Sequence, residues 1–404
     1  MARILFVWEL GGGIGHLTRI KLLALTLRKR GYEPVFVLKD LSRSEMVFGH
    51  DGFACYQAPL WLPKVAGLPL AATFPELLFR FGYLDPDGLL GIVRAWRGLL
   101  DLLQPDLLIA DHAPTALLAA RSMDMRRAQF GNGFAVPPRL CPMPPFRTWE
   151  KNDARRIEQS ENKTLAGANH VLQRFNLPQL KTFSELFEVD EEFLCIWPEL
   201  DHYPQRSTPH YWGPTMLLGE GPQPVWPMGD GKRIFAYLKG DYSYLEPVLQ
   251  ALQSLPNPTL AYVAGISPAL VSKYQSASLA FSSQPVGMDA ARREADLMVC
   301  HGGDATVSAA LLAGKPLMVL PMHAEQYGTA KNVERLGAGL NVAPENYKPD
   351  YRRLFKRLLN EASFTRQAQA FAEKYSGFDS VAQIEQIADR CEQLINRRPC
   401  TIAG

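Results

Sequence analysis

The chain has 404 residues, of which 47% are hydrophobic and 21% charged, a length and composition that predict two globular domains. Its net charge of +2 gives no general reason to expect nucleic acid or an anionic membrane as partner, although it leaves local basic patches open. Glu9 interrupts the first apolar run too early for a signal peptide, and no run of about 18 apolar residues predicts a transmembrane segment. Six cysteines without a CxxC pair indicate reduced thiols in a cytoplasmic protein.

Strand and helix patterns alternate along the first third of the chain. Strands are predicted at residues 3–10, 33–40, 105–111 and 126–132, with helices at 16–31 and 115–123. Such alternation is typical of an α/β domain with a doubly wound parallel sheet. Residues 55–100 and 134–148 are rich in proline and lack a clean period, so we expect long loops or short helices there.

A second run of alternation follows a segment dense in proline and glycine at residues 203–231, which is the best domain boundary. Its strands are predicted at 233–239, 259–264, 279–284, 297–300 and 316–321, and its helices at 244–255, 268–275, 289–295, 304–314 and 326–336. Residues 350–397 are helical and charged. The two halves therefore share one architecture.

A glycine-rich turn, GGGIGH at residues 11–16, separates the first strand from the first helix. Three of its glycines are candidate residues of a functional N-terminal loop: Gly12, Gly13 and Gly15. A tight turn that needs positive φ explains them structurally. A dinucleotide fingerprint is a rival interpretation, with Asp40 as the ribose-binding acid, but His16 replaces the third glycine.

His16 and Asp111 both follow strands of the first predicted sheet. Because the carboxyl ends of parallel strands meet at one edge, the carboxylate can hold one nitrogen of the imidazole while the other accepts a proton. The alternative for Asp111 is a plain N-cap of the helix near Pro114, and the sequence leaves the two about even. We expect the neighbouring His112 to point elsewhere, since successive side chains of a strand diverge.

The second half carries the most informative stretch. A histidine and two glycines follow an apolar strand and run into a helix, at His301, Gly302, Gly303, Asp304, Ala305 and Thr306. This order presents backbone N–H groups that can bind a phosphate. The alternative interpretation is that His301 is a histidine buried in the core. We expect Asp304 or Thr306 to cap the helix.

The next strand ends just before Glu325 and Gln326. This pair both accepts and donates hydrogen bonds, as sugar hydroxyls require, although an acid in a first helical turn is also favoured structurally. A phosphate cradle and a hydroxyl binder at one sheet edge predict a nucleotide-sugar site. Asp85 and Asp87 have the spacing of a metal-binding DxD motif, but a turn and helix cap explain them better, so we assign no metal and no cofactor.

Together these residues resemble the two-domain glycosyltransferases of the GT-B fold, in the branch of UDP-glucuronosyl, plant secondary-metabolite and antibiotic (macrolide, glycopeptide) glycosyltransferases. The resemblance rests on QPVGMDAARREADLMVCHGG, AGKPLMVLP, the Glu325-Gln326 pair and NVERLGAG, in that order. It implies two Rossmann-like domains that face each other across a cleft. The expected parts are an acceptor-binding domain at 1–205, a linker at 206–231, a donor-binding domain at 232–380 and a C-terminal helix at 381–404 that packs back on the first domain.

The resemblance also implies an inverting, metal-independent enzyme that moves a sugar from a UDP- or dTDP-sugar to a hydroxyl of a small-molecule or lipid/glycan acceptor. His16 is then the catalytic base and Asp111 orients it, residues 301–306 bind the diphosphate, and Glu325 and Gln326 bind the sugar. Nucleic acid is not an expected partner.

Several positions depart from the family pattern. The donor-binding stretch reads GDAT at residues 303–306, which differs from the usual family sequence. Ala309 stands where a ribose-binding glutamate is common in the family, and this leaves room for a deoxyribose nucleotide. GIGHLTR also resembles the GxGHxxR loop of a bacterial nucleotide-sugar hydrolase of the same fold. Hydrolysis of a nucleotide sugar is therefore one alternative function, and a non-catalytic partner subunit is another.

Overall fold

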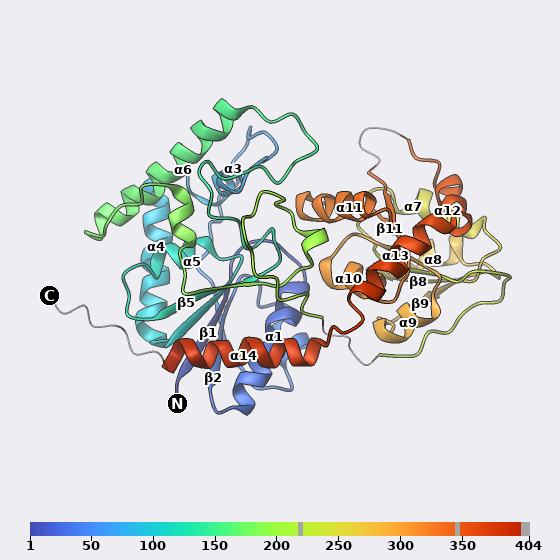
Figure 1. The fold of residues 1–404 in the computed structure, drawn as a ribbon, viewed down its shortest axis with the longest axis horizontal. Helices are drawn as coiled ribbons and strands as arrows, with labels where there is room; N and C mark the ends of the chain where they lie inside the picture. Colours follow the sequence, from blue (N-terminus) through green and yellow to red (C-terminus); the bar gives the residue numbers. More distant parts are fainter. Residues whose placement is uncertain (217–220, 344–347, 397–404) are drawn as a thin grey trace. The chain divides into compact units, whose positions relative to one another are not determined.

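A computed structural model of the chain describes residues 1–216, 221–343 and 348–396. The chain divides into two compact units (Figure 1). The first contains Met1–Trp197, Tyr203–Thr215 and the residues from Asp379 onward, and the second contains Pro198–His202 and Met216–Phe378. The change from one unit to the other thus falls within the 206–231 segment, apart from a short excursion at Pro198–His202.

The first unit is built on a six-stranded sheet with the order β3-β2-β1-β4-β5-β6, in which every pairing is parallel. Its strands are β1 (Arg3–Trp8), β2 (Glu33–Leu38), β3 (Ala54–Gln57), β4 (Leu107–Asp111), β5 (Arg126–Gly131) and β6 (Glu191–Leu194). The strand order reverses between β1 and β4, and in open α/β sheets such a reversal opens a crevice at the carboxyl ends of the strands. The predicted doubly wound sheet is confirmed.

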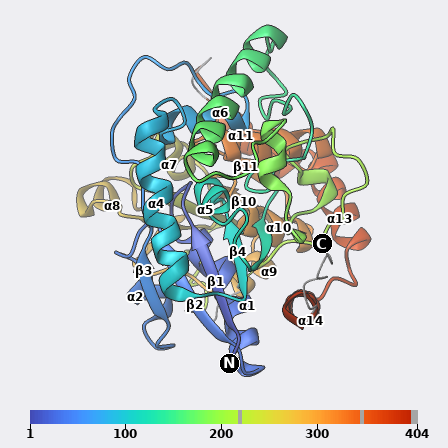
Figure 2. The same cartoon turned by 90° about the vertical axis from the view of Figure 1, so that its left-hand side faces the viewer.

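Helices cover both faces of this sheet because successive side chains of each strand point to opposite sides. They are α1 (Gly15–Lys29), α2 (Ser44–Phe48), α3 (Phe74–Leu78), α4 (Pro86–Leu103), α5 (Pro114–Ala119), α6 (Ala154–Arg174) and α14 (Ser380–Asn396). Val7 of β1 faces the core shared with α4, α5 and α6, and Phe6 faces the core shared with α1 and α14. Figure 2 views the unit from the side of α4 and α6.

Of the two irregular segments predicted in the first unit, one contains a longer helix than expected and the other agrees with the expectation. We expected loops or short helices over residues 55–100, with an apolar helix after Asp85 and Asp87; that helix is present but longer than expected, since α4 occupies Pro86–Leu103. Val93, Trp96 and Leu100 lie at helical spacing and are buried, so a regular amphipathic pattern was present but was masked by the irregular residues before it. Residues 134–148 contain neither helix nor strand, as expected.

The second unit repeats the plan with a six-stranded sheet of order β12-β11-β10-β7-β8-β9. Its strands are β7 (Ile234–Lys239), β8 (Thr259–Ala264), β9 (Leu279–Ser282), β10 (Leu297–Cys300), β11 (Leu317–Val319) and β12 (Gly339–Asn341). Its helices are α7 (Leu245–Gln253), α8 (Pro268–Tyr274), α9 (Met288–Glu294), α10 (Asp304–Leu312), α11 (Ala324–Leu336), α12 (Tyr351–Asn360) and α13 (Ala362–Lys374). Here the order reverses between β7 and β10, so the second crevice lies at the ends of those strands.

After α13 the chain returns to the first unit, where α14 packs beside α1 (Figure 1). Ile387 and Cys391 of α14 join the core formed with α1 and the sheet. Arg30, just beyond the end of α1, forms ion pairs with Asp389 at 2.7 Å and with Glu385. Within the three described ranges, no helix is both long and apolar enough to cross a bilayer.

Candidate active site

His16 and Asp111 meet at the first reversal of strand order. His16 is the second residue of α1, directly after the β1 turn, and Asp111 is the last residue of β4. Nδ1 of His16 lies 2.9 Å from Oδ2 of Asp111, and the side chains are 9% and 0% exposed. The structure therefore brings together the pair that spacing suggested, in the geometry that fixes the tautomer of an imidazole.

The N-cap interpretation of Asp111 is wrong, because a different carboxylate caps the following helix. Oε2 of Glu9 accepts hydrogen bonds from the backbone N–H groups of Thr115 at 2.8 Å and Ala116 at 3.4 Å, in the first turn of α5. The N-cap residue itself, Ala113, makes no side-chain bond. The carboxylate of Asp111 instead bonds Nδ1 of His16.

Trp8 and Gly11 fix the position of the His16 ring. The indole of Trp8 stacks on the imidazole with ring centroids 5.0 Å apart and an interplanar angle of 19°. Gly11 has a φ of +82°, and a Cβ atom there would lie 2.6 Å from Nε2 of His16. Gly11 therefore has to be a glycine, both for its backbone conformation and to make room for the ring.

The glycines that the sequence singled out have weaker requirements. A Cβ atom at Gly12, Gly13 or Gly15 would meet nothing within 4 Å, and of the three only Gly13 has a positive φ, at +88°. The sequence did not single out Gly11. The need for glycine there comes largely from the folded position of the His16 ring, which a Cβ atom at residue 11 would meet.

Cations hold the pKa of the Asp111 carboxyl below its usual value. Burial acts to raise this pKa, but nearby His16 and Arg19 lower it by more. Nη1 of Arg19 lies 3.7 Å from Oδ1, the carboxylate oxygen that does not contact His16. Asp111 is accordingly a carboxylate at neutral pH and able to stabilise an imidazolium.

The expectation that His112 points away from this cluster is wrong. Its ring lies 6.4 Å from that of His16, and also contacts Phe74 at 5.6 Å and Phe134 at 5.7 Å. The cause is local, because His112 has left the strand and adopts a positive φ of 50°, so strand alternation no longer applies. The rings continue to Phe146, 4.9 Å from Phe134, and give the neighbourhood of His16 an aromatic lining.

The two remaining acidic motifs of the first half have local roles. Asp40 accepts a hydrogen bond from the N–H of Ser42 at 2.9 Å, and this bond lowers its pKa. Asp85 is the N-cap of α4 and accepts from the N–H of Gly88 at 3.0 Å, which confirms the cap interpretation of the DxD spacing. In the described part of the chain no cluster of three His, Cys, Asp or Glu residues suits a metal.

In the second unit, His301 ties three neighbouring strands together. Its Nδ1–H donates to the carbonyl of Leu320 after β11 at 2.7 Å, and its Nε2 accepts from the N–H of Lys239 at the end of β7 at 3.0 Å. Burial lowers the pKa of His301, so the ring is neutral and this tautomer is the one that satisfies both bonds. Both ring nitrogens are thus used by the backbone.

The glycines after His301 allow a close approach of two elements. Gly302 has a φ of +91°, and a Cβ atom there would lie 2.9 Å from Cγ1 of Val319 and 3.2 Å from the carbonyl oxygen of Gln326. Gly303, in contrast, is exposed and would meet nothing, and it serves as the N-cap of α10. The backbone at Gly302 therefore packs closely against β11 and α11, whereas Gly303 and Ala305, at the start of α10, are exposed.

The expectation that Asp304 or Thr306 is the N-cap of α10 is wrong, because the N-cap residue is Gly303, which has no side chain to bond the first turn. Oδ1 of the buried Asp304 instead accepts from the hydroxyl of Thr329 on α11 at 3.5 Å. Ala305 is exposed and Thr306 half-buried. The first turn of α10 thus keeps backbone N–H groups that side chains do not cap, which suits an anion.

Glu325 and Gln326 open α11 next to this turn. Oε1 of Gln326 accepts from the N–H of Met322 at 2.8 Å, which leaves the amide nitrogen as its donor group. The carbonyl oxygen of Glu325 contacts Nε2 of His202 at 3.0 Å, and its side chain is half-buried. Within the second unit, the phosphate turn and this pair therefore lie at one sheet edge, as the sequence suggested.

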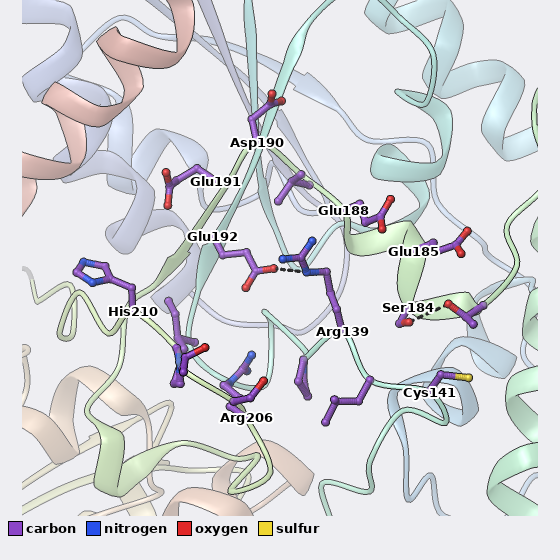
Figure 3. A pocket seen from close by; sticks show the side chains of 18 residues that line it. Arg139, Cys141, Ser184, Glu185, Glu188, Asp190, Glu191, Glu192, Arg206 and His210 are labelled. Atoms are coloured by element: carbon purple, nitrogen blue, oxygen red, sulfur yellow. Dashed lines mark hydrogen bonds and ion pairs between the residues drawn. The ribbon is translucent and has the colours of Figure 1, made fainter.

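A separate cavity lies at the edge strand β6 (Figure 3). It has a volume of about 810 Å³ and is lined by polar residues, among them Arg139, whose Nε lies 3.1 Å from Glu192. Its lining includes none of the candidate residues above. We therefore place the candidate chemistry at the strand ends and not in this cavity.

Comparisons with known proteins agree with this geometry. Residues 270–389 match the glycosyltransferase family 28 C-terminal domain. A PGL/p-HBAD biosynthesis glycosyltransferase of Mycobacterium tuberculosis is 25% identical over 403 residues, which cover 93% of this chain and 90% of that protein. A zeaxanthin glucosyltransferase of Pseudescherichia vulneris is 25% identical over 366 residues, with 81% and 83% covered.

Solved structures show the same fold. The calicheamicin glycosyltransferase CalG4 superposes with a TM-score of 0.71 at 18% identity, over 98% of this chain and 99% of that one. The spinosyn rhamnosyltransferase SpnG complexed with thymidine diphosphate gives 0.69 at 16% identity, over 96% and 100%. The chain is therefore a glycosyltransferase with the GT-B fold, and residues 270–389, most of them in the second unit, are similar to the family 28 C-terminal domain.

Proposed function

We propose that this protein is a cytoplasmic, inverting and metal-independent enzyme that transfers a sugar from a nucleotide diphosphate sugar to a hydroxyl group of its acceptor. The observation that carries the proposal is the buried His16–Asp111 pair, with 2.9 Å between Nδ1 and Oδ2, at the carboxyl edge of the first sheet. An imidazole oriented by a carboxylate is the arrangement by which enzymes remove a proton from a hydroxyl group.

In the proposed reaction the first unit activates the acceptor. Nε2 of His16 takes the proton of the acceptor hydroxyl, and the oxygen attacks the anomeric carbon from the side opposite the diphosphate. Asp111 holds the opposite nitrogen and stabilises the imidazolium that forms. Such general-base assistance contributes typically 10²–10⁴-fold to turnover.

The second unit holds the donor. Backbone N–H groups of the first turn of α10, at Ala305 and Thr306, bind the diphosphate together with the positive end of the helix dipole. His301 holds the strand ends that position this turn, because its own nitrogens are occupied by Lys239 and Leu320. The amide of Gln326 and the carboxylate of Glu325 bind sugar hydroxyls.

A thymidine nucleotide is the favoured donor. Ala309 stands at the position of the common ribose-binding glutamate and is fully buried, so no side chain from this position is available for a ribose hydroxyl. One structural relative is titled as a complex with thymidine diphosphate, which supports the same class. A UDP-sugar is the second class of donor to test.

The acceptor is a hydroxylated small molecule, lipid or glycan with an apolar part. The ring of Trp8 beside His16, and those of Phe74 and Phe134 beside the neighbouring His112, support this choice. So does the name of one relative, a zeaxanthin glucosyltransferase.

The proposal is tested with a panel of dTDP- and UDP-sugars in the presence of EDTA, with and without candidate acceptors. We expect nucleotide diphosphate release that depends on an acceptor, resists EDTA and gives a glycoside of inverted anomeric configuration by NMR. Fast stoichiometric release of free sugar from donor alone would instead establish hydrolysis, the alternative suggested by Arg19 in GIGHLTR next to Asp111. Failure of every nucleotide to bind would indicate a non-catalytic partner subunit.

A further inference from the structure

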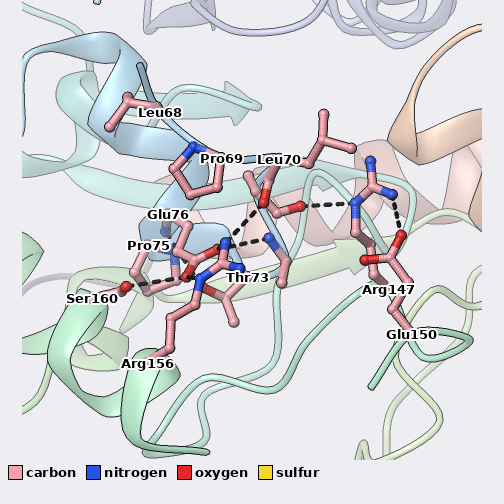
Figure 4. A network of polar contacts seen from close by, with 12 residues as sticks. Leu68, Pro69, Leu70, Thr73, Pro75, Glu76, Arg147, Glu150, Arg156 and Ser160 are labelled. Atoms are coloured by element: carbon pink, nitrogen blue, oxygen red, sulfur yellow. Dashed lines mark hydrogen bonds and ion pairs between the residues drawn. The ribbon is translucent and has the colours of Figure 1, made fainter. Parts of the chain in front are cut away.

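Two buried carboxylates of the first unit face an arginine, and the two contacts differ in kind. Glu76 is held by Arg156, whose Nε and Nη2 each donate to one carboxylate oxygen at 2.7 Å (Figure 4). Nη1 of Arg19, in contrast, lies 3.7 Å from Oδ1 of Asp111, which is beyond hydrogen-bond distance. Arg156 fixes its carboxylate in place, whereas Arg19 acts on Asp111 through its charge.

Arg19 reaches Asp111 because of its place on α1. It follows His16 by three residues, so both side chains lie on one face of the helix. Gly131 at the end of β5 leaves room for the guanidinium, since a Cβ atom there would lie 3.2 Å from Nη1 of Arg19 and 3.6 Å from Oδ1 of Asp111. The arginine side chain is 13% exposed and the carboxylate 0%, so little solvent screens the contact.

The His16–Asp111 pair can accept a proton only in a negatively charged form. Nε2 of His16 is bare when the pair holds a single proton, the one on Nδ1 that bonds the carboxylate. With a second proton the pair is neutral and Nε2 carries a hydrogen, whether the other proton lies on Nδ1 or on the carboxyl group. Burial favours this neutral form, because a buried charge without a partner is costly.

Arg19 supplies a cation that the negatively charged form needs. Although burial acts to raise the pKa of the Asp111 carboxyl, three groups hold it below its usual value: His16, Arg19 and the neighbouring His112. The two histidines are cations only when protonated, and His16 must be neutral to act as a base. An arginine stays charged throughout the pH range in which proteins are folded. Of the three groups, Arg19 is therefore the one that still stabilises the carboxylate when Nε2 is bare.

Other titratable groups surround the pair. The ring of His112 after β4 lies 6.4 Å from that of His16. Burial raises the pKa of the Cys195 thiol, after β6, to about 12, so this group carries no charge. Glu9, whose pKa burial raises to about 7, interacts with Lys39. Because the variants below leave these groups unchanged, a difference from the wild-type pH profile reports the substituted residue.

We propose that Arg19 is a positioning residue of the transfer reaction, whose guanidinium keeps Nε2 of His16 available to the acceptor hydroxyl by stabilising the negatively charged His16–Asp111 pair. The effect is exerted through Asp111 and requires neither donor nor acceptor. The inference rests on the proposed function for its consequence in catalysis, but the protonation of Nε2 can be followed without any substrate.

The experiment follows the ¹⁵N NMR signals of the His16 ring against pH in the full-length protein, assigned by their loss in His16→Ala. In Arg19→Gln the pH at which Nε2 loses its proton should rise by about 1–3 pH units, the size of effect that an arginine has on a neighbouring carboxylate. The acid side of the turnover profile should move with it, and turnover should recover at higher pH.

A lysine at the same position tests whether charge is the property that matters. The contact is too long for the paired hydrogen bonds of a guanidinium, so a point charge can replace it. Arg19→Lys should therefore return both midpoints to within about half a pH unit of wild type. Should Arg19→Gln fail to fold, Arg19→Met, which keeps an apolar stem of similar length, takes its place with the same expectation.

Arg156→Gln is the matched control, since it also removes an arginine from a buried carboxylate of the first unit. It should lower the unfolding temperature, because Glu76 loses its partner, and should leave both pH midpoints unchanged. A shift as large as that of Arg19→Gln would overturn the proposal, since any loss of a buried ion pair would then produce it.

Two further outcomes would also overturn it. One is an Nε2 signal that titrates at the wild-type pH in Arg19→Gln. The other is turnover that Arg19→Gln lowers by the same factor at every pH, since Arg19 would then serve only the packing of the site. Absence of sugar transfer with every donor would instead refute the proposed function, and the NMR titration would then decide the role of Arg19 by itself.

Discussion

Each unit carries a histidine near its reversal of strand order, His16 at the start of the helix after β1 and His301 directly after β10, and the two imidazoles have opposite hydrogen-bonding patterns. His16 bonds to the protein through Nδ1 alone, and among the described residues no group bonds its Nε2. His301 uses both nitrogens on backbone groups of neighbouring strands. The same residue type thus keeps one ring nitrogen for the proposed proton transfer in one sheet and holds strand ends together in the other.

The first unit still needs a clamp, and Glu9 supplies it. This carboxylate follows β1 and bonds the first turn of α5, which keeps the β1 and β4 ends together without using His16. The comparison indicates that a histidine near a strand end keeps a ring nitrogen for proton transfer only where another side chain holds the neighbouring strand ends together. Four predictions test this division of labour.

The largest effect is expected from His16→Ala. Removal of the base should lower turnover by about 10²–10⁴-fold, because the acceptor proton then has no oriented acceptor. Donor binding, measured by calorimetry with thymidine diphosphate, should persist. His50→Ala, an exposed histidine of the same unit, is the control and should keep wild-type turnover. Unchanged turnover in His16→Ala would remove this residue from the mechanism.

His301→Ala should act on stability first. It leaves the Lys239 N–H and the Leu320 carbonyl without their partner, and buried unsatisfied groups cost about 1–3 kcal/mol each, so the unfolding free energy should fall by about 2–6 kcal/mol. Urea denaturation measures this loss. The exposed His50 of the first unit provides a control, for which alanine should change stability by less than about 0.5 kcal/mol. Full stability in His301→Ala would refute the clamp.

The buried Glu9 should make the folded protein less stable as the pH rises. Burial raises the pKa of Glu9 to about 7 from its ordinary 4.5, so the folded state binds a proton that the unfolded state has already lost between these values. Its contribution is therefore complete below pH 4.5 and disappears as the pH rises through 7. Glu9→Gln should gain about 3 kcal/mol relative to wild type between pH 5 and pH 8, by urea denaturation at each pH. A constant difference across this range would contradict the prediction.

The smallest effect is expected from Gly11→Ala, which should lower turnover by about tenfold through displacement of the His16 ring. The new Cβ would lie 2.6 Å from Nε2, and the positive φ adds strain. Gly12→Ala is the matched control, since a Cβ there meets nothing within 4 Å. The NMR signals of the imidazole should shift in the first variant and not in the second. Equal behaviour of the two variants would show that the ring does not depend on this gap.

The predictable part of the candidate site followed from local order along the chain. His16, Asp111, His301 and the Glu325-Gln326 pair could be chosen because each follows a strand pattern, and in a parallel sheet all strands end at the same edge. The roles of these residues could not be chosen in the same way. Asp111 was compatible with a cap, and only the position of Glu9, 106 residues from Thr115, decided against it.

The errors have the same origin. His112 was assigned by strand alternation, but it has left the strand and turns with a φ of 50°. Asp304 was assigned to its own helix, but Thr329 on the next helix takes its carboxylate. Residues 58–73 were recognisable as irregular and apolar, yet the bonds that Arg80, Arg147 and Arg156 make to their backbone become visible only when segments up to 86 residues apart are placed together.

The amino-acid sequence by itself determined the two α/β sheets and the strand ends that carry polar residues, because hydrophobic periodicity and turn glycines act over a few neighbouring residues. The tertiary structure alone decided what each polar group bonds. The partner of His16 is 95 residues away and that of Nε2 of His301 is 62 residues away, and whether an imidazole nitrogen is left for chemistry depends on such distant partners.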